Sequence, residues 1–280
     1  MCFWRSKRRR GLLVEAVKRD QPLAVINRLI QRGADVNLGD RNDQQVTPLM
    51  SAVELFRDDI VSALLASSDI QVDKRGDLGG SALHLAAMMN NVQAVKLLIA
   101  AGADVNASED KHNYTPLMWS VHRRFNEIVE LLLAHNDIQV DKRGDRYQFT
   151  ALHIAVINCD AETEAVRLLI ANGADVNAQD GDGDTPLLLC ATKMTDVDAM
   201  AMVSVMLAEA GVDKLDLNAQ DSAANTALHY AVRKGMKGLE QLLRENGARD
   251  NICNNNGKTA DQMIVEFHAD HNSPVSSGAK

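Results

Sequence analysis

Residues 81–106 read SALHLAAMMNNVQAVKLLIAAGADVN, and this stretch holds the parts of one structural unit. Ser81 is suited to cap a first helix, because a serine side chain accepts the free N–H groups of a helix's first turn. The residues that follow give that helix a narrow apolar face, in which Ala86 and Ala87 are small enough to let a neighbouring helix approach closely. The first half of the stretch therefore predicts a short helix that packs against another helix.

The second half of the same stretch predicts a second helix and a stop signal. Val95, Leu98 and Ile99 recur at three- and four-residue spacing, which places them on one side of a helix. Gly102 follows, and glycine commonly ends a helix because it adopts the left-handed conformation without strain. The unit is therefore a helix, a short turn, a second helix and an extended hairpin loop.

One tetrad recurs at the start of each predicted first helix. Three copies have proline after threonine, at the first helical position, where a missing N–H costs nothing. The starts differ by 34, 34, 35, 35, 41 and 33 residues, and such self-similarity indicates a repeat array. The copies are Thr47-Pro48-Leu49-Met50, Ser81-Ala82-Leu83-His84, Thr115-Pro116-Leu117-Met118, Thr150-Ala151-Leu152-His153, Thr185-Pro186-Leu187-Leu188, Thr226-Ala227-Leu228-His229 and a degenerate Thr259-Ala260-Asp261-Gln262.

These parts resemble the ankyrin repeat over roughly residues 11–270. The family pattern has Thr-Pro-Leu-His-x-Ala at the first helix, Val-x-x-Leu-Leu in the second and Gly-Ala-Asp-Val-Asn after it. This chain matches the pattern in register at Thr47, His84, Gly33–Asn37, Gly102–Asn106 and Gly173–Asn177. The resemblance implies an all-α repeat solenoid of stacked ankyrin helix-turn-helix units with short β-hairpin loops.

The register predicts the organisation of the whole chain. We expect a basic N-terminal arm at residues 1–10, one ankyrin repeat array at 11–270 and a flexible C-terminal tail at 271–280. A lead unit has helices near 12–19 and 22–32, and six complete units and a closing helix near 259–269 follow. The units start near residues 11, 47, 81, 115, 150, 185 and 226.

Two features depart from a uniform array. Residues 69–77 and 137–145 both read DIQVDKRGD, which indicates duplication of a two-repeat block. There Ser68 or Asn136 replaces the helix-stopping glycine, and asparagine tolerates the left-handed conformation that such an end requires. The unit that starts at 185 is six or seven residues longer than the others, around 194–199 and 211–217. Insertions in repeat arrays usually emerge as loops, so we expect loops there.

The charge is unevenly distributed. The net charge is −8, but MCFWRSKRRR at residues 1–10 carries five positive charges, which leaves −13 on the rest of the chain. An acidic body repels phosphate backbones, so we expect no nucleic-acid binding through the main surface. For the arm, three roles remain open: a solvated segment that shields the first repeat, an import signal, or a weak contact with an anionic membrane through cations beside Phe3 and Trp4.

The cysteines and the hydropathy pattern bear on location. Cys2, Cys159, Cys190 and Cys253 are far apart and form no CxxC pair, which favours a reducing compartment. No apolar run has the length of a secretory segment or a membrane span. We expect a cytoplasmic monomer, with a nuclear location open through the arm and a host-cytosol location if the protein is exported.

Several short motifs have a plain structural reading. Arg75–Asp77 and Arg143–Asp145 spell the adhesion triplet Arg-Gly-Asp, but they lie where the family has polar turn residues. Residues 180–184 begin like a calcium loop, but Thr185 and Ala191 replace the glycine and the glutamate that such a loop needs. We expect turns at all three places.

The histidines and asparagines of the repeat have structural roles. His84, His153 and His229 recur with a period too long to gather around a metal ion. The resemblance implies that these histidines hydrogen-bond to the hairpin backbone and that Asn37, Asn106, Asn177 and Asn218 support the hairpins. No nucleophile with a neighbouring base is apparent, so no catalytic residue, metal or cofactor is expected.

Binding is expected on the outward positions of the first helices and on the hairpin tips of the middle repeats, because the rest of the stack is scaffold. Trp119 replaces the family's usual aliphatic residue there, and Trp, Tyr and Arg are the types most enriched among binding hot spots. The alternative is that these aromatic residues merely cover helix ends. The candidate contact residues are Met88, Met89, Tyr114, Trp119, Arg123, Arg124, Phe125, Arg146 and Tyr147, with the cations Lys74, Arg75, Lys142 and Arg143.

These patterns predict a non-catalytic protein–protein interaction module. Its surface would suit an acidic or phosphorylated segment of a protein partner. An alternative is a bacterial effector or host-directed protein that captures a host protein, with HNSPVSSGAK at the C-terminus serving export. An enzyme would require a domain outside the repeats, for which only about ten residues at each end remain.

Overall fold

The computed structural model describes residues 11–40, 45–158 and 163–263. Helices occur in consecutive pairs, and backbone contacts group them into two units, one ending at Arg146 and one starting at Tyr147. The first unit contains the pairs α2 (Leu12–Lys18) and α3 (Leu23–Gln31), α4 (Pro48–Glu54) and α5 (Asp58–Leu65), α6 (Ala82–Met88) and α7 (Val92–Ala100), and α8 (Pro116–His122) and α9 (Asn126–Leu133).

The second unit continues the same alternation. Its pairs are α10 (Ala151–Ile157) and α11 (Glu164–Ala171), α12 (Pro186–Lys193) and α13 (Asp196–Ala210), and α14 (Ala227–Lys234) and α15 (Lys237–Glu245). Residues 260–263 are also helical, at the place where the closing helix is predicted to begin.

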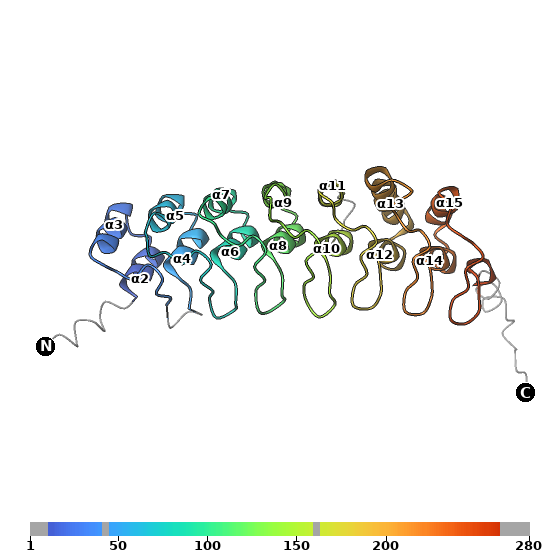
Figure 1. Ribbon diagram of the computed structural model, residues 1–280, viewed down its shortest axis with the longest axis horizontal. Coiled ribbons are helices and arrows are strands. Elements are labelled where there is room, and N and C mark those ends of the chain that lie inside the picture. Colours follow the sequence, from blue (N-terminus) through green and yellow to red (C-terminus); the bar gives the residue numbers. More distant parts are fainter. Residues whose placement is uncertain (1–10, 41–44, 159–162, 264–280) are drawn as a thin grey trace, which may run out of the picture. The chain divides into compact units, whose positions relative to one another are not determined.

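The helices of each unit form two layers (Figure 1). The first helices of successive pairs pack together, α4 against α2 and α6 in the first unit and α12 against α10 and α14 in the second. The second helices form the other layer, with α5 against α3 and α7, and α13 against α11 and α15. The described ranges contain no β-strand. The fold is therefore an all-α repeat solenoid, and the finger loops that join each pair to the next are built from turns.

Local hydrogen bonds explain why each first helix starts at the tetrad. The Thr115 side chain accepts the N–H of Met118 at 3.2 Å, and Pro116 occupies the first helical position. In the tetrads that contain histidine, the ring completes the cap: Nδ1 of His84 accepts the Ser81 N–H at 3.2 Å, while the Ser81 side chain accepts the His84 N–H. The same capping box forms at Thr150 and His153 and at Thr226 and His229.

The tetrad histidines also attach each first helix to the finger loop that follows its unit. Nε2 of His84 lies 3.0 Å from the Ala107 carbonyl, and burial lowers the pKa of His84. A neutral ring that accepts at Nδ1 and donates at Nε2 satisfies both contacts. The corresponding distances in the second unit are 3.2 Å from His153 to the Asp184 carbonyl and 3.1 Å from His229 to the Lys258 carbonyl. These contacts confirm the predicted bonds to the hairpin backbone.

Asparagine side chains connect successive finger loops. Nδ2 of Asn106 donates to the Asp137 carbonyl at 2.7 Å, and its Oδ1 accepts the Gln139 N–H at 2.8 Å. Asn37 and Asn177 make the equivalent pair of bonds to the next loop in their own units. The predicted structural role of these asparagines is confirmed.

The second helices end in two different ways. Gly102 ends α7 with a φ of 82°, the left-handed conformation that glycine adopts without strain. The left-handed conformation expected at Asn136 is wrong, because Asn136 has no positive φ, and Ser68 has none either. After α9 the chain instead closes a further turn, in which the Ile138 N–H donates to the His135 carbonyl at 3.1 Å.

The longest unit carries its extra residues mainly in a helix. Its second helix, α13, has 15 residues, whereas the other second helices have 8 or 9. The Thr195 side chain caps α13 by accepting the Asp198 N–H at 3.3 Å, and no glycine or proline interrupts the helix before Gly211. The prediction of a loop at 194–199 is therefore wrong, whereas residues 211–217 do form a loop.

Some predictions fall outside the described residues. They concern the basic arm at residues 1–10, Cys159, the second half of the closing helix and the C-terminal tail. No helix in the described ranges combines the length and hydropathy needed to cross a membrane.

Candidate functional site

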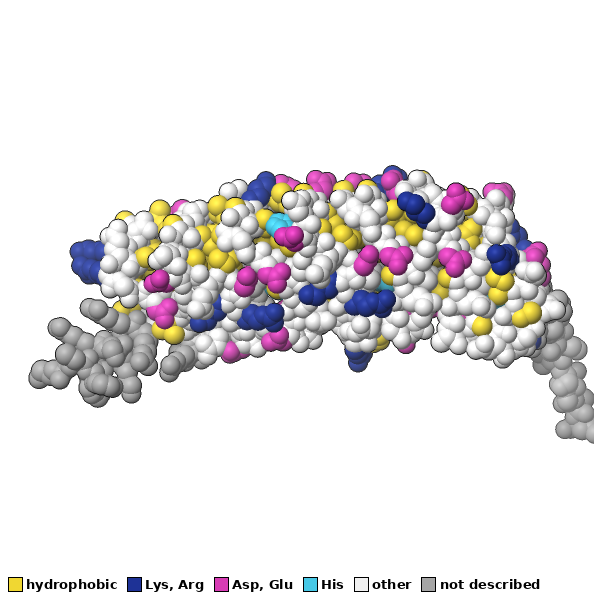
Figure 2. All heavy atoms as spheres, in the orientation of Figure 1, with side chains coloured by type: hydrophobic (Ala, Val, Ile, Leu, Met, Phe, Trp, Pro, Cys, Tyr) yellow, Lys and Arg dark blue, Asp and Glu magenta, His cyan; other side chains and the backbone are white. Residues whose placement is uncertain are grey.

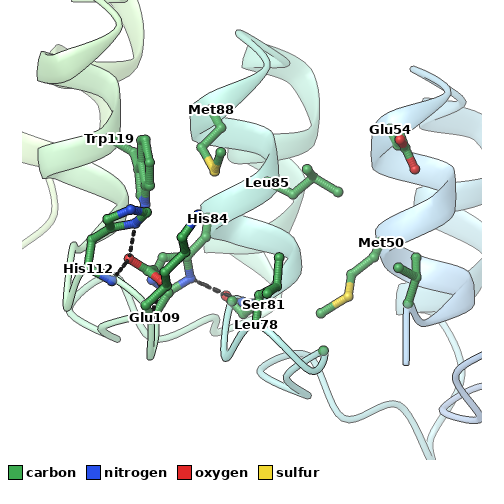
Figure 3. Close-up of a pocket in the computed structure, with 14 residues that line it drawn as sticks. Met50, Glu54, Leu78, Ser81, His84, Leu85, Met88, Glu109, His112 and Trp119 are labelled. Carbon is green, nitrogen blue, oxygen red and sulfur yellow. Dashed lines mark hydrogen bonds and ion pairs between the residues drawn. The ribbon is translucent and has the colours of Figure 1, made fainter. Parts of the chain in front are cut away.

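A groove of about 370 Å³ lies in the first unit, between the first helices α4, α6 and α8 and the finger loops beside them (Figure 3). Five large apolar side chains line it: Met50, Leu78, Leu85, Met88 and Trp119. Its charged or titratable side chains are Glu54, His84, Glu109, Lys111 and His112. A groove of this size that is mostly apolar, with a few polar groups, is typical of a ligand-binding site.

The direction of these side chains follows from the helical period. On α6, Ala86 and Ala87 are fully buried, whereas Leu85 and Met88, three residues apart, are partly exposed on another side. In each first helix, we call two residues the outward pair: those four and seven positions after the first residue of the tetrad. The outward pair is Leu85 and Met88 on α6 and Trp119 and His122 on α8.

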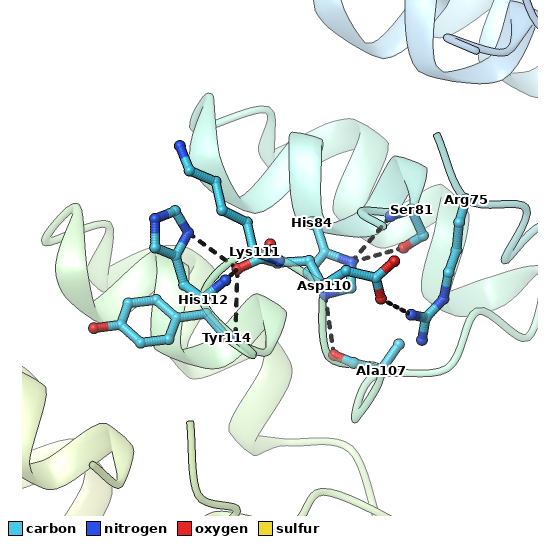
Figure 4. Close-up of polar contacts among 9 residues, drawn as sticks. Arg75, Ser81, His84, Ala107, Asp110, Lys111, His112 and Tyr114 are labelled. Atoms are coloured by element: carbon cyan, nitrogen blue, oxygen red, sulfur yellow. Dashed lines mark hydrogen bonds and ion pairs between the residues drawn. The ribbon is translucent and has the colours of Figure 1, made fainter. Parts of the chain in front are cut away.

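The buried carboxylate of Glu109, labelled in Figure 3, shapes the finger loop beside the groove, and Figure 4 labels its partners Lys111 and His112. Glu109 is 6% exposed, and its carboxylate accepts the N–H groups of Lys111 and His112, both at 2.7 Å. The same carboxylate lies 3.1 Å from Nδ1 of His112. These bonds fix the loop from which Lys111 and His112 reach the groove, and they compensate the burial of the Glu109 charge.

Aromatic rings hold Trp119 in place. Its ring centroid lies 5.3 Å from that of Tyr114, 5.5 Å from that of His112 and 5.8 Å from that of His122. All three contacts are edge-to-face, the geometry that aromatic quadrupoles favour. The indole is therefore positioned before any partner arrives, which lowers the entropy cost of binding.

The aromatic cluster holds polar groups in unusual environments. The indole Nε1 of Trp119 is buried and has no hydrogen-bond partner. Burial and the nearby Asp145 carboxylate raise the pKa of Tyr114 to about 12, so its hydroxyl stays neutral at physiological pH. Burial and the adjacent Arg123 charge lower the pKa of His122, which favours its neutral ring. The cluster thus presents mainly an apolar surface.

The groove contains two of the predicted contact residues, Met88 and Trp119. Tyr114 packs behind the indole rather than lining the groove. Arg123, Arg124 and Phe125 form the turn between α8 and α9, where Arg124 has a φ of 62°. The turn after α6 contains Met89. Arg146 is the last residue of the first unit, and Tyr147 belongs to the second unit, where it stacks on Phe149.

The predicted cations are partly committed to the loops. Arg75 pairs with Asp110 at 2.9 Å, and Nζ of Lys142 donates to the Asn106 carbonyl at 2.5 Å. Lys74 is partly exposed and Arg143 is exposed, and neither lines the groove. Figure 2 shows basic and acidic side chains interspersed in the lower part of the view, where Figure 1 places the finger loops. The predicted surface is therefore of mixed charge.

The two Arg-Gly-Asp copies are parts of turns. In the first copy, Gly76 is bonded through its N–H to the Gly80 carbonyl at 3.0 Å. In the second copy, Gly144 is buried, and a Cβ atom there would lie 2.7 Å from Sδ of Met118. A side chain there would therefore force Met118 to shift and would crowd the Asn113 carbonyl at 3.1 Å, so packing favours glycine at this position.

The predicted acidic turn at 180–184 has a structural explanation. Asp180 is 8% exposed, and its carboxylate accepts the N–H groups of Asp182 and Asp184, both at 2.9 Å. Within the described part of the chain, no group of three or more His, Cys, Asp and Glu side chains is arranged to hold a metal ion.

Several groove residues were missed from the sequence. Leu85 and Glu54 lie at outward-pair positions, so the helical register that selected Trp119 and Met88 contains the signal for both. Leu78 is 52% exposed in a finger loop and carries no such signal. The role of Glu109 depends on how its own loop folds, which the repeat pattern does not specify.

Comparisons with known proteins indicate the same repeat fold that the structure shows. A family model for ankyrin repeats in three copies matches residues 13–109, 107–180 and 158–256. The mouse B-cell lymphoma 3 protein homolog is 30% identical, over 79% of this chain and 48% of its own length. Human inversin is 33% identical over 71% of this chain and 18% of its own length. The crystal structure of the ankyrin repeat domain of Bcl-3 superposes with a TM-score of 0.69 at 27% identity, covering 79% of this chain and 98% of that structure.

The match covers only part of these relatives. The chain spans about half or less of the length of the curated relatives that it matches.

Proposed function

The chain belongs to the ankyrin repeat family, and we propose that it is a non-catalytic module that holds a segment of a partner protein in the groove along α4, α6 and α8. Ankyrin repeats generally serve as protein–protein interaction modules, which use the surface formed by their first helices and finger loops. The specific groove and the kind of segment are our proposal for this chain.

One observation carries the proposal: the groove presents apolar side chains that the framework does not require. The buried face of α6 needs Ala86 and Ala87 to be small, but nothing in the helix packing demands Leu85 or Met88 on the other side. Water-exposed apolar surface is costly to maintain without a use, and clustered apolar surface with a polar rim is typical of binding sites. Trp119, a common hot-spot residue, lies at one end of this surface.

The charges at the groove describe the segment that would fit. Lys111 is exposed, and its ammonium forms no ion pair within the described ranges. On α4, Glu54 is likewise exposed and outside any ion pair there. A partner segment with an apolar side chain between Met88 and Trp119 could place a carboxylate or phosphate near Lys111. The proposed preference for an acidic or phosphorylated segment therefore depends on one cation of the groove, Lys111.

The absence of catalysis is part of the same proposal. Two polar groups of the groove are engaged in shaping it: Glu109 holds backbone N–H groups, and His84 connects α6 to its finger loop. No observation on the described residues favours the effector alternative over a resident module.

The test is peptide selection followed by substitution. Short random peptides displayed on phage are selected on the intact protein, and the affinities of the selected peptides are measured for the wild type and for Trp119→Ala. Loss of a hot-spot tryptophan costs about 2 kcal/mol or more, so we expect Kd to rise roughly thirty-fold or more.

A matched control uses the same helical position in the two units. Met88→Ala should weaken the selected peptides, whereas Ile157→Ala, at the corresponding position of α10, should not. Circular dichroism and urea unfolding establish that the variants remain folded. Selected peptides that bind Trp119→Ala and Met88→Ala as tightly as the wild type would place recognition elsewhere and overturn the proposal.

A further inference from the structure

Three cations gather at the carboxyl ends of α12 and α14 in the second unit. Lys193 is the last residue of α12, and Arg233 and Lys234 end α14. Nζ of Lys234 reaches across to the Thr192 carbonyl at 2.5 Å, which brings the ends of the two helices together. All three side chains belong to exposed residues.

None of these three cations has a carboxylate partner in the described part of the chain. The acidic residues of the adjoining helices are used elsewhere. Asp196 accepts the N–H groups of Gly238 and Leu239 at 2.9 and 2.8 Å and so caps α15, and Glu240 pairs with Lys237. The Lys193 charge partly offsets the raised pKa of Asp184, but no carboxylate forms an ion pair with any of the three cations in the described part of the chain.

An aromatic ring holds one of the cations in place. The Arg233 guanidinium carbon lies 4.7 Å from the centroid of the Tyr230 ring, a cation–π contact. The Tyr230 hydroxyl in turn donates to Asp221 in the finger loop. Stacking on the ring leaves the N–H groups of Arg233 available to an incoming anion.

The cations also repel one another. Burial lowers the pKa of Lys234, and the neighbouring charges of Arg233 and Lys193 lower it further. The ends of α12 and α14 carry partial negative charge from their free carbonyl groups, which favours cations there. An anion bound beside the three cations would reduce their mutual repulsion.

We propose that Lys193, Arg233 and Lys234 form a second interaction surface, which binds an acidic segment of a partner protein. The three charges lie on two neighbouring helices, so successive carboxylates of an extended segment can pair with them one after another. A nucleic acid or an anionic membrane is a poorer partner, because the body of the protein around the cations is acidic. This surface is independent of the groove in the first unit.

The experiment measures binding of a fluorescent peptide of alternating glutamate and serine to the intact protein by fluorescence anisotropy. A second peptide with glutamine in place of glutamate controls for charge. The test variant is Lys193→Gln with Arg233→Gln, and Lys234 is kept because it binds the Thr192 carbonyl. We expect the glutamate peptide to bind more tightly than the glutamine peptide, with a Kd that rises about tenfold in the variant and also rises with salt.

A matched variant removes the same charge from the first unit. Arg28→Gln with Arg32→Gln neutralises two exposed cations at the end of α3, and it should leave the Kd within about twofold. Equal binding of the two peptides, or equal losses in the two variants, would overturn the proposal.

Parallel titrations with phosphatidylserine vesicles and single-stranded DNA complete the test. If either binds through Lys193 and Arg233 while the glutamate peptide does not, the surface serves another class of partner and the proposal fails. The groove variants Trp119→Ala and Met88→Ala test the proposed function separately. Weaker binding of the selected peptides to those variants therefore does not affect this result.

Discussion

Helices α6 and α8 of the first unit and helix α14 of the second unit display different chemistry from the same backbone positions. In the first unit, the outward pairs Leu85 and Met88, and Trp119 with His122, give an apolar surface. In the second unit, the outward pair of α14 is Tyr230 and Arg233, beside further cations. The residue before the tetrad differs as well: it is Tyr114 before α8 and Asp184 before α12.

This difference separates what folds the chain from what it binds. Both units use the same caps, the same histidine contacts to the finger loops and the same asparagine bonds between loops. None of these contacts involves an outward pair. The framework therefore tolerates either surface, and similarity of fold alone does not identify a partner.

The largest expected effect tests whether the framework is the same in the two units. His84→Ala and His229→Ala should each lower the free energy of unfolding by about 2–4 kcal/mol, because each leaves a buried N–H and a buried carbonyl without a partner. Urea unfolding monitored by circular dichroism measures both losses. His122→Ala, on an exposed ring, should cost no more than about 1 kcal/mol. If the His84 variant were as stable as the His122 variant, the capping box would not contribute measurably to the stability of the repeats.

The features shared by the units are those that the sequence predicts well. Caps, prolines and stop glycines act within one turn of a helix, so the tetrad locates the start of each first helix directly. The wrong predictions arise where two local backbone conformations compete. At Asn136 a further turn replaces a left-handed residue, and at 194–199 a capped, uninterrupted run extends α13 where a loop is expected. Such choices depend on the energy of the surrounding structure and leave no distinct pattern in the sequence.

An intermediate effect is expected from transferring the surface of one unit to the other. Trp119→Tyr with His122→Arg gives α8 the outward pair that α14 has. The free energy of unfolding should change by about 1 kcal/mol or less, because both positions lie outside the helix packing. Peptides selected on the wild-type groove should lose at least about tenfold in affinity.

Urea unfolding and peptide titration on the same samples separate the two consequences of that transfer. Leu98→Ala provides the scale for a framework change, since Leu98 is fully buried and such a truncation costs about 2–5 kcal/mol. A transfer variant as unstable as Leu98→Ala would show that the outward pairs do support the fold, and the separation of framework from surface would fail.

The site could be predicted only in part, for a physical reason. Trp119 is conspicuous because its position usually holds an aliphatic residue, whereas Leu85 is an ordinary residue type whose exposure depends on its angle around the helix. The predicted cations show a second limit of the sequence. Arg75 and Lys142 look available in the sequence, but their neighbours in the next or preceding loop bind them. Charge is assigned to a surface only after the partners of each charge are known.

The smallest effect concerns the residue before the tetrad, where the second unit has Asp184. Burial raises the pKa of Asp184 from 3.8 to about 6, and the nearby Asp180 and Asp221 carboxylates add to the shift. A raised folded-state pKa means that the fold favours the protonated acid. The resulting stabilisation is fully present below the unfolded-state pKa of 3.8 and is lost as the pH rises through about 6.

Asp184→Asn resembles the protonated acid at every pH, so its advantage should depend on pH. Its melting temperature should exceed that of the wild type by roughly 1–2 °C at about pH 8, because solvent screens a carboxylate that is only half-buried. The difference should shrink towards zero as the pH falls to about 4, where Asp184 itself is protonated in the fold. The exposed Asp213→Asn is the matched control and should show no such trend. An Asp184→Asn advantage that is constant between these pH values would have to come from packing or hydrogen bonding of the amide. In that case the charge of Asp184 would not affect the stability of the fold. The two units would then differ at this position only in what they bind.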